Sequence, residues 1–277
     1  MIFLISSCST KSAIVSKKSY SEYYGLIGLI SSLNPLIVSN IEFSYKKKPI
    51  IKFNGLTNNS DQLRVGHYVS IEYVIDNNIN VPKLINVRHI LIGPVLLSSK
   101  EDLISINQKI ENKNLKKNKL KNLKPGQWIA VSGLRKNNSL INPSIIEILP
   151  SQAAGLLRGK ISNISENFIM LGSSKFELRP LPLSVKKGDN VLVRYTFQNR
   201  VLKSFAITNI HSNYFTRSVR SLSIEGYIEL GNDGFLRVSG FPYLLNNHKK
   251  LKLGDHVVLS GYIKPGRIFH IEKEFIL

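Results

Sequence analysis

The stretch 251–261 reads LKLGDHVVLSG, and three other stretches of the chain repeat its pattern. The related stretches are LRVGHYVSIEY at 63–73, LKPGQWIAVSG at 123–133 and VKKGDNVLVRY at 185–195. In each, a glycine follows an apolar residue at a distance of three and precedes alternating apolar side chains. Alternation of this kind predicts a half-buried β-strand, and the glycine predicts a turn with positive φ. The repetition indicates several copies of one β-rich module.

Two further markers recur in the same order around this phrase. A glycine followed by any residue and then Ile or Val occurs at Gly28, Gly93, Gly159 and Gly226, at spacings of 65 to 67 residues. An apolar segment closes each copy: VPKLINVRHI, SLINPSIIEI, RVLKSFAITNI and RIFHIEKEFI. The markers divide the chain into a partial signal at 1–8, a polar tether at 9–23 and four repeats at 24–92, 93–150, 155–211 and 223–277.

The third repeat gives the expected strand order most clearly. Its predicted strands are GKISNIS, FIML, KFELRP, NVLVRYTF and VLKSFAITNI, with the short crossing LPLSVKKGD before the fourth. Five short strands with a crossing between the third and fourth are typical of an OB-type barrel. We therefore expect an all-β chain of four tandem OB-like five-stranded β-barrels, in which this crossing contains no more than a helical turn.

The alternation also assigns the side chains that face each barrel interior. The residue that follows the glycine, Asp in two copies, is expected to accept backbone hydrogen bonds within the turn. The inward positions are Val69, Ile71, Tyr73, Ile129, Val131, Gly133, Val191, Val193, Tyr195, Val257, Leu259 and Gly261.

The order of these markers resembles a bacterial family of uncharacterised OB-like domains. The elements that carry the resemblance are G-x-[IV], a strand hairpin, [LV]-x-x-G-[DQHN]-x-[VI]-x-[VLI]-x-[GY] and a closing strand such as AITNI. Members commonly occur in tandem in exported proteins and lipoproteins. The resemblance covers the chain from about residue 24 onward, and it implies a fold but brings no established activity.

Cys8 lies in a context, LISSCST, that is typical of bacterial lipoprotein processing. Small residues before the cysteine suit the signal peptidase, and the thiol would carry the lipid. Only seven residues precede Cys8, fewer than a secretory signal needs, so we expect an upstream start codon or a partial signal. The alternative is an ordinary free cysteine. Because it is the chain's one cysteine, no intrachain disulfide is expected.

The formal net charge of +20 favours a polyanionic partner such as an anionic membrane surface or nucleic acid. A second explanation is composition, because a chain rich in Lys, Asn and Ile reflects an AT-rich coding sequence. Tyr45 and Phe53 flank the first basic cluster and would be the best candidates for base stacking. The candidate polyanion-binding residues are Lys46, Lys47, Lys48, Lys52, Lys116, Lys117, Lys119 and Lys121.

No residue set in the sequence points to catalysis or to a metal. The six histidines form no HExxH or paired-ligand spacing, and the acidic residues are scattered. His67 and His256 both lie in copies of the repeated phrase, and we interpret them as surface side chains. No run of eighteen apolar residues occurs, so no transmembrane helix is predicted.

The sequence thus predicts a non-enzymatic cell-envelope lipoprotein without a cofactor. It would be anchored through Cys8, lie against an anionic membrane surface and face the periplasm. It would bind or scaffold an envelope protein or polymer through its barrels. The alternative is a cytoplasmic protein that binds single-stranded nucleic acid through basic loops.

Overall fold

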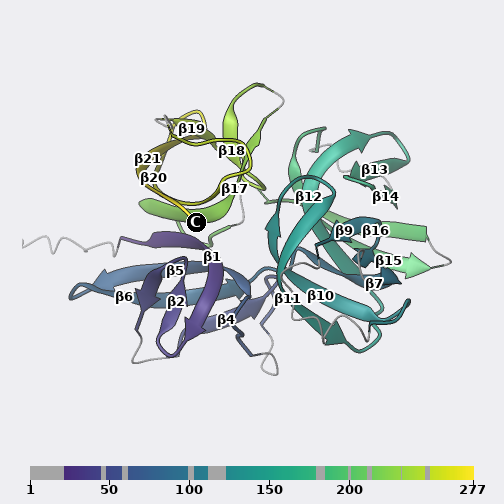
Figure 1. Ribbon diagram of the computed structural model, residues 1–277, viewed down its shortest axis with the longest axis horizontal. Coiled ribbons are helices and arrows are strands. Elements are labelled where there is room, and N and C mark those ends of the chain that lie inside the picture. The colour runs from purple at the N-terminus through teal and green to yellow at the C-terminus, as the bar shows by residue number, and fades with distance from the viewer. Residues whose placement is uncertain are drawn as a thin grey trace, which may run out of the picture.

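The computed structural model in Figure 1 describes residues 22–44, 48–57, 62–98, 103–111, 123–178, 185–198, 201–210, 214–231, 233–246 and 250–277. The chain is all-β over these ranges and contains no α-helix in them, which confirms the expected class. None of the described segments is a helix long and apolar enough to cross a membrane.

The strands form two large sheets, which occupy opposite sides of Figure 1. The first sheet has eleven strands: β1 (Tyr24–Leu33), β2 (Leu36–Val38), β3 (Ile41–Phe43), β4 (Ile50–Phe53), β5 (Tyr68–Asp76), β6 (Ile79–Val87), β17 (Ser221–Leu230), β18 (Leu236–Val238), β19 (Leu244–Asn246), β20 (His256–Lys264) and β21 (Ile268–Ile276). The second has ten: β7 (Leu91–Ser98), β8 (Leu103–Ser105), β9 (Gln108–Ile110), β10 (Trp128–Arg135), β11 (Leu140–Leu149), β12 (Gly155–Ile164), β13 (Phe168–Leu171), β14 (Ser174–Glu177), β15 (Asn190–Gln198) and β16 (Val201–Asn209).

Strands β12–β16, called group 3 below, close into a five-stranded barrel. The ladder runs β12–β13–β14–β16–β15 and returns to β12, with β14 and β16 parallel and the other pairs antiparallel. The five strands coincide with the five segments expected from the sequence. The segment 179–184, in which the helical turn was expected, lies outside the described residues.

Strands β7–β11, group 2, close in the same way. The ladder runs β7–β8–β9–β11–β10 and returns to β7, and its parallel pair is β9 with β11. The two barrels share one continuous apolar core, which includes Val131 from β10 and Val193 from β15. A substitution that destabilises the interior of one barrel should therefore destabilise the other barrel as well.

Strands β1–β6 (group 1) and β17–β21 (group 4) make up the eleven-stranded sheet. In group 1, β2 pairs with β1 and β3, while β4 runs parallel to β6. In group 4, β18 pairs with β17, and β19 runs parallel to β21. Both groups contain an antiparallel ladder of the first strand and the last two strands, β1–β5–β6 and β17–β20–β21.

The four groups are joined in pairs by hydrogen bonding between their first strands. β1 runs parallel to β17 from Tyr24–Ile27 against Ser221–Ile224, and β7 meets β12 in antiparallel orientation at Leu91 and Ile92. Segments from opposite ends of the chain therefore lie side by side, as the purple and yellow-green ribbons in Figure 1 show.

The expected inward positions are confirmed. Every residue assigned to an interior by alternation is buried, and Val69, Ile129, Val193 and Leu259 are fully inaccessible. The alternation predicts that the outward side chains of these strands are exposed. In β5 and β10 they are not, because Ser70, Glu72 and all residues of β10 are buried as well. The outer faces of these strands pack against other groups, so a single strand contributes to two interfaces.

The repeated glycine adopts the predicted left-handed conformation in all four phrases. Its φ is 93° at Gly66, 84° at Gly126, 94° at Gly188 and 84° at Gly254. The next residue donates its backbone N–H to the carbonyl three positions earlier, which closes a tight turn.

The side chain after each glycine caps the same turn. Asp189 accepts the backbone N–H of Lys186 at 3.0 Å, and Asp255 accepts that of Lys252 at 2.7 Å. Gln127 and His67 accept the equivalent N–H groups at 3.2 and 3.1 Å through Oε1 and Nδ1. The expected role of the aspartates is confirmed, and three residue types perform it.

The variants Gly254→Ala and Gly66→Ala distinguish the destabilisation caused by backbone strain in the turn from that caused by a clash with another group. Open space surrounds Gly254, so alanine there should cost about 1–2 kcal/mol of left-handed strain alone. At Gly66 a Cβ would lie 3.0 Å from the Ser144 carbonyl oxygen and 3.2 Å from the Ile145 Cβ, so the loss should be larger. Urea denaturation of both variants measures the difference. Equal losses would contradict close packing of the first turn against β11.

Candidate functional site

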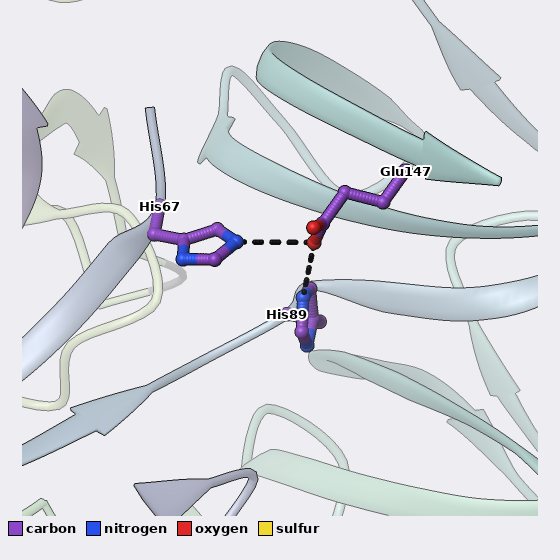
Figure 2. Close-up of side chains that lie close together, drawn as sticks. All are labelled: His67, His89 and Glu147. Atoms are coloured by element: carbon purple, nitrogen blue, oxygen red, sulfur yellow. Dashed lines mark hydrogen bonds and ion pairs between the residues drawn. The ribbon is translucent and has the colours of Figure 1, made fainter. Parts of the chain in front are cut away.

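Two buried histidines and a glutamate from three separate segments converge between groups 1 and 2 (Figure 2). His67 precedes β5, His89 lies between β6 and β7, and Glu147 is on β11. The Nε2 atoms of His67 and His89 lie 3.0 and 3.2 Å from the same oxygen, Glu147 Oε2. The histidine rings meet edge to face at a centroid distance of 5.8 Å.

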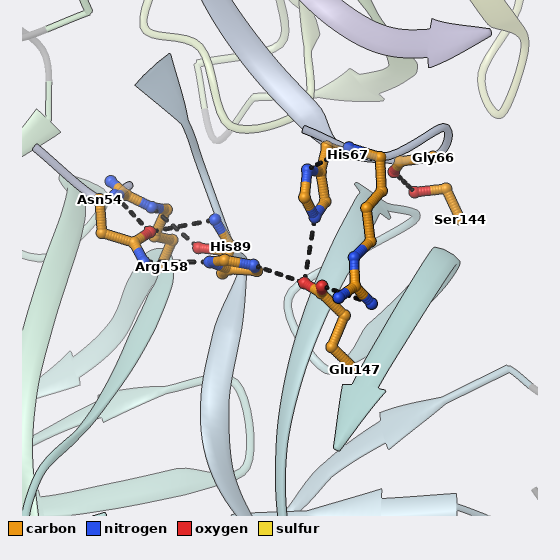
Figure 3. Close-up of polar contacts among 8 residues, drawn as sticks. Asn54, Gly66, His67, His89, Ser144, Glu147 and Arg158 are labelled. Atoms are coloured by element: carbon orange, nitrogen blue, oxygen red, sulfur yellow. Dashed lines mark hydrogen bonds and ion pairs between the residues drawn. The ribbon is translucent and has the colours of Figure 1, made fainter. Parts of the chain in front are cut away.

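Hydrogen bonds on the far side of each ring determine where its proton lies. His67 Nδ1 accepts the backbone N–H of Arg64, so a neutral His67 carries its proton on Nε2 and donates it to Glu147. The side-chain oxygen of Asn54 accepts the backbone N–H of His89 at 3.0 Å, which leaves the Asn54 amide nitrogen as donor to His89 Nδ1 (Figure 3). His89 therefore also donates from Nε2.

Glu147 is the acceptor for the whole cluster. Its other oxygen, Oε1, pairs with Arg64 at 3.2 Å. Burial favours the neutral carboxyl, but the hydrogen bonds from His67 and His89 outweigh it and hold the pKa of Glu147 well below its usual range. Burial lowers the pKa of His89 despite the neighbouring carboxylate, so its imidazole is held neutral. A neutral histidine, an ionised glutamate and an arginine form one network.

Zinc would fit the composition of this cluster but not its hydrogen bonding. The candidate ligand atoms of His67, His89 and Glu147 lie within 4.8 Å of one another. A metal-bound Nε2 requires the proton on Nδ1, where it normally donates to an oxygen. Both Nδ1 atoms instead face N–H donors. The cluster is therefore arranged as a hydrogen-bond network that joins group 1 to group 2.

Addition of Zn²⁺ is accordingly expected to leave the melting temperature unchanged. A ligand that binds the folded state raises the melting temperature, whereas these imidazoles must first exchange both hydrogen bonds and protons. Differential scanning fluorimetry with and without excess zinc checks this. A stabilisation that His89→Gln abolishes would contradict it, because the cluster would then rearrange into a metal site.

Stability should fall as the pH drops below about 6.5, the ordinary pKa of histidine. The unfolded chain protonates His89 there, whereas the folded chain resists, so acid favours unfolding. Below about 4.5, the ordinary value for glutamate, Glu147 adds a second loss of the same sign. Urea midpoints at pH 7.5, 5.5 and 4 measure the effect. His89→Gln should flatten the upper part of the profile, and an unaltered profile would contradict this assignment.

A cleft of about 510 Å³ lies beside the cluster, where groups 1, 2 and 3 meet. Arg64, His89 and Glu147 form part of its wall, and group 3 contributes Arg194 of β15 to the lining. Arg194 donates to the Asn54 carbonyl at 3.1 Å. The polar side chains of Asn54, Gln62 and Gln152 also line the cleft. Its larger apolar lining side chains are Phe53, Leu56, Ile92, Leu149 and Leu156.

Most of the sequence-predicted site lies outside the described residues. This applies to Cys8 and to the candidate polyanion residues Lys46, Lys47, Lys116, Lys117, Lys119 and Lys121. Lys48 is exposed and Lys52 on β4 is half-buried.

Phe53 does not occupy the expected position for base stacking. It is buried, meets His67 edge to face and stacks on His89 with ring centroids 6.4 Å apart. Its ring supports the histidine cluster and is not displayed on an open surface. The other flanking aromatic residue, Tyr45, lies outside the described residues.

The surface interpretation of His67 was wrong. Its exposure is 0%, and that of His89 is 5%, because group 2 covers both. His256 is a quarter exposed at its side chain and pairs with Glu225 at 3.0 Å. The signal that could have indicated burial was the substitution of His67 for the turn-capping Asp, since a histidine that caps the turn through Nδ1 leaves Nε2 on the opposite side of its ring as a donor to another segment.

The resemblance to tandem OB-like domains rests on the repeated sequence elements described above, while the structure shows an all-β chain with a closed five-stranded barrel. Neither a scan against protein-family models nor a search of curated proteins found a match to this chain.

Proposed function

We propose that the protein is a non-enzymatic binding and scaffolding component of the bacterial cell envelope. It is a lipoprotein anchored through Cys8 that faces the periplasm and lies against anionic headgroups. Its body consists of four copies of one OB-like module. Lipid attachment and a basic surface act together, because one anchor plus a basic patch holds a membrane better than either alone.

The proposal of four modules is supported by equivalent turns and ladders. The four capped glycine turns each precede a long strand, β5, β10, β15 or β20. Each of these strands pairs with the first and last strand of its group. In group 1 the third strand is divided into β3 and β4, which fits the longer sequence between its hairpin and its glycine turn.

The cleft between groups 1, 2 and 3 is the observation that carries the binding proposal. Its volume of about 510 Å³ is within the range of small-molecule sites. Arg194 supplies a cation, and the apolar side chains around it supply a surface that a hydrocarbon could cover. The ligand is therefore a small organic anion with an apolar body.

The neighbouring cluster supports binding over catalysis. A general base needs an accessible lone pair and a pKa near the working pH. Here both ring nitrogens of His67 and His89 are already hydrogen-bonded, and Glu147 is held ionised. The cluster fixes the wall of the cleft and keeps Arg64 in place.

Fluorescence titration with 2-naphthoate, and with neutral 2-naphthamide as its partner, tests the cleft. Arg194→Gln should weaken naphthoate binding at least about tenfold, because a charge-assisted hydrogen bond is lost, and leave the amide unaffected. Arg217→Gln, at an exposed arginine outside the cleft lining, is the matched control and should change neither. Equal binding of the two probes, or no binding of either, would refute the ligand class.

Membrane fractionation of the native protein and a Cys8→Ser variant tests the anchor. The native protein should be in the membrane fraction and release only with detergent, while the variant should be soluble. Identical fractionation of the two proteins would exclude lipid anchoring.

The net charge of +20 supports a second candidate function, binding of single-stranded nucleic acid by basic loops in the cytoplasm. Contacts with several phosphates would give a steep fall in affinity with salt. A salt titration with a labelled single strand decides the matter. Absence of binding at low salt would eliminate this candidate.

A further inference from the structure

A second cleft, of about 310 Å³, lies between groups 3 and 4 and carries an excess of positive charge. Group 3 contributes Lys160 of β12 and residues 186–190 around its glycine turn, while group 4 contributes the β17–β18 hairpin and Arg267. Five basic side chains line the cleft, against three carboxylates. The basic residues are Lys160, Lys186, Lys187, Arg237 and Arg267, and the acidic ones are Asp189, Glu229 and Asp233.

Two of the three carboxylates already have partners within their own turns. Asp189 caps the glycine turn of group 3, and Asp233 accepts two hydrogen bonds from Arg237 at 2.8 and 2.5 Å. In the described part of the chain, no carboxylate forms an ion pair with the other four basic side chains. Three of these four are exposed and Lys160 is half-buried. Accessible cations gathered around one cleft favour an anionic partner.

Exposed apolar side chains lie beside this cleft. Leu230 and Phe235, which flank the turn between β17 and β18, are each more than half exposed, and both are within two residues of side chains that line the cleft. Leu253, in the glycine turn of group 4, is exposed to a similar degree. The next residue, Gly254, donates to the Ile228 carbonyl of β17 at 2.9 Å, so this turn lies against the same strand. The surface therefore combines apolar and basic groups.

An anionic phospholipid matches both parts of this surface. Its phosphate group accepts hydrogen bonds from lysine and arginine, and the boundary between headgroups and acyl chains covers apolar side chains. A single-stranded nucleic acid would use the cations and one aromatic ring, but it would leave Leu230 and Leu253 in water. The composition of the surface therefore favours a membrane over a nucleic acid.

We propose that the cleft between groups 3 and 4 binds the phosphate headgroup of an anionic phospholipid, while Leu230, Phe235 and Leu253 enter the acyl boundary. The inference rests on the proposed membrane location and assigns it to one face of the molecule. The volume of about 310 Å³ is sufficient for a headgroup. The site is separate from the cleft proposed for the organic anion, because no described residue lines both.

Co-sedimentation of the full chain with lipid vesicles tests this surface. Cys8→Ser is present throughout, so that no lipid anchor contributes. The chain should bind vesicles of phosphatidylglycerol and phosphatidylcholine at least about tenfold more tightly than vesicles of phosphatidylcholine alone, because each basic residue near an anionic surface contributes roughly a factor of five. Equal binding to the two kinds of vesicle, or binding to neither, would overturn the proposal.

Paired lysine variants distinguish this surface from a general effect of net charge. Lys186→Gln with Lys187→Gln should weaken binding to the anionic vesicles about tenfold or more. Lys83→Gln with Lys273→Gln removes the same charge from exposed strand lysines outside the cleft lining and should weaken it about twofold or less, because distant charges are screened. Equal losses in the two double variants would refute the assignment.

Phe235→Ser tests whether the hairpin enters the membrane. It should weaken vesicle binding about fivefold through the loss of apolar contact, whereas Phe205→Ser, at an equally exposed phenylalanine of β16, should not. Unaltered binding of Phe235→Ser would refute insertion. If a labelled single strand binds through Lys186 and Lys187 while vesicles do not bind, the partner is a nucleic acid and the proposal fails.

The vesicle experiment and the membrane fractionation of the native protein fail independently. A native protein that fractionates with membranes through Cys8, but whose Cys8→Ser form shows no preference for anionic vesicles, would refute this surface and leave the lipid anchor supported. Vesicle binding that depends on Lys186, Lys187 and Phe235, together with identical fractionation of the native and Cys8→Ser proteins, would support this surface and exclude the anchor.

Discussion

Val193→Asp is expected to unfold the barrel formed by group 3 and to disrupt that of group 2. Val193 is fully inaccessible, at the centre of β15, within a core cluster to which both barrels contribute. An aspartate there has no partner, and an unpaired buried charge costs several kcal/mol. That is a large part of the 5–15 kcal/mol by which an ordinary domain is stable.

Phe205→Asp on the neighbouring strand β16 is the matched control. Phe205 is 58% exposed, so the same new charge should change stability by no more than about 0.5 kcal/mol. Urea denaturation followed by circular dichroism, with hydrogen exchange over β7–β16, measures both variants. If Val193→Asp melted like the unaltered chain, the inward assignment of β15 would be wrong.

Glu147→Ala is expected to lower the free energy of unfolding by about 3 kcal/mol. The substitution leaves the Nε2–H groups of His67 and His89 without their acceptor, and Arg64 without its ion pair. Each buried donor left unsatisfied costs about 1–3 kcal/mol. The loss should appear first as separation of group 1 from group 2, since the cluster joins them.

Glu111→Ala is the control for the loss of a glutamate. Glu111 pairs with Lys136 at 2.9 Å, and the lysine side chain is more than a third exposed. Such a pair contributes at most about 1 kcal/mol. Glu147→Gln, which keeps one acceptor oxygen, should fall between the two alanine variants. Chemical denaturation ranks the three, and similar values for Glu147→Ala and Glu111→Ala would show that the cluster does not stabilise the junction.

The local sequence pattern was sufficient to predict the strands and the glycine turns before them. The positive φ of Gly254 and the inward placement of Val257 and Leu259 follow from the repeated phrase alone. These features depend on neighbours in sequence and on the interior of one barrel, which the alternation of apolar residues reports directly.

The local sequence pattern was insufficient to predict the histidine–glutamate cluster or the cleft beside it. Glu147 is 80 residues from His67 and 58 from His89, and no spacing rule connects them. Ser70 and Glu72 occupy outward positions of a predicted strand, yet both are buried against other groups. Alternation predicts which side chains face a barrel interior and contains no information on what covers its exterior.

The sequence by itself determined the all-β class, the glycine turns and the apolar interiors, because these are set within some ten residues of each repeated phrase. Only the tertiary structure decided that β1 pairs with β17, that His67 and His89 share Glu147, and that Arg135 and Arg158 border one central cavity. The first of these contacts joins the edges of two strands, and the other two arise where side chains of different strand groups meet. The relative orientation of the groups selects them, and residues distant in sequence then become neighbours.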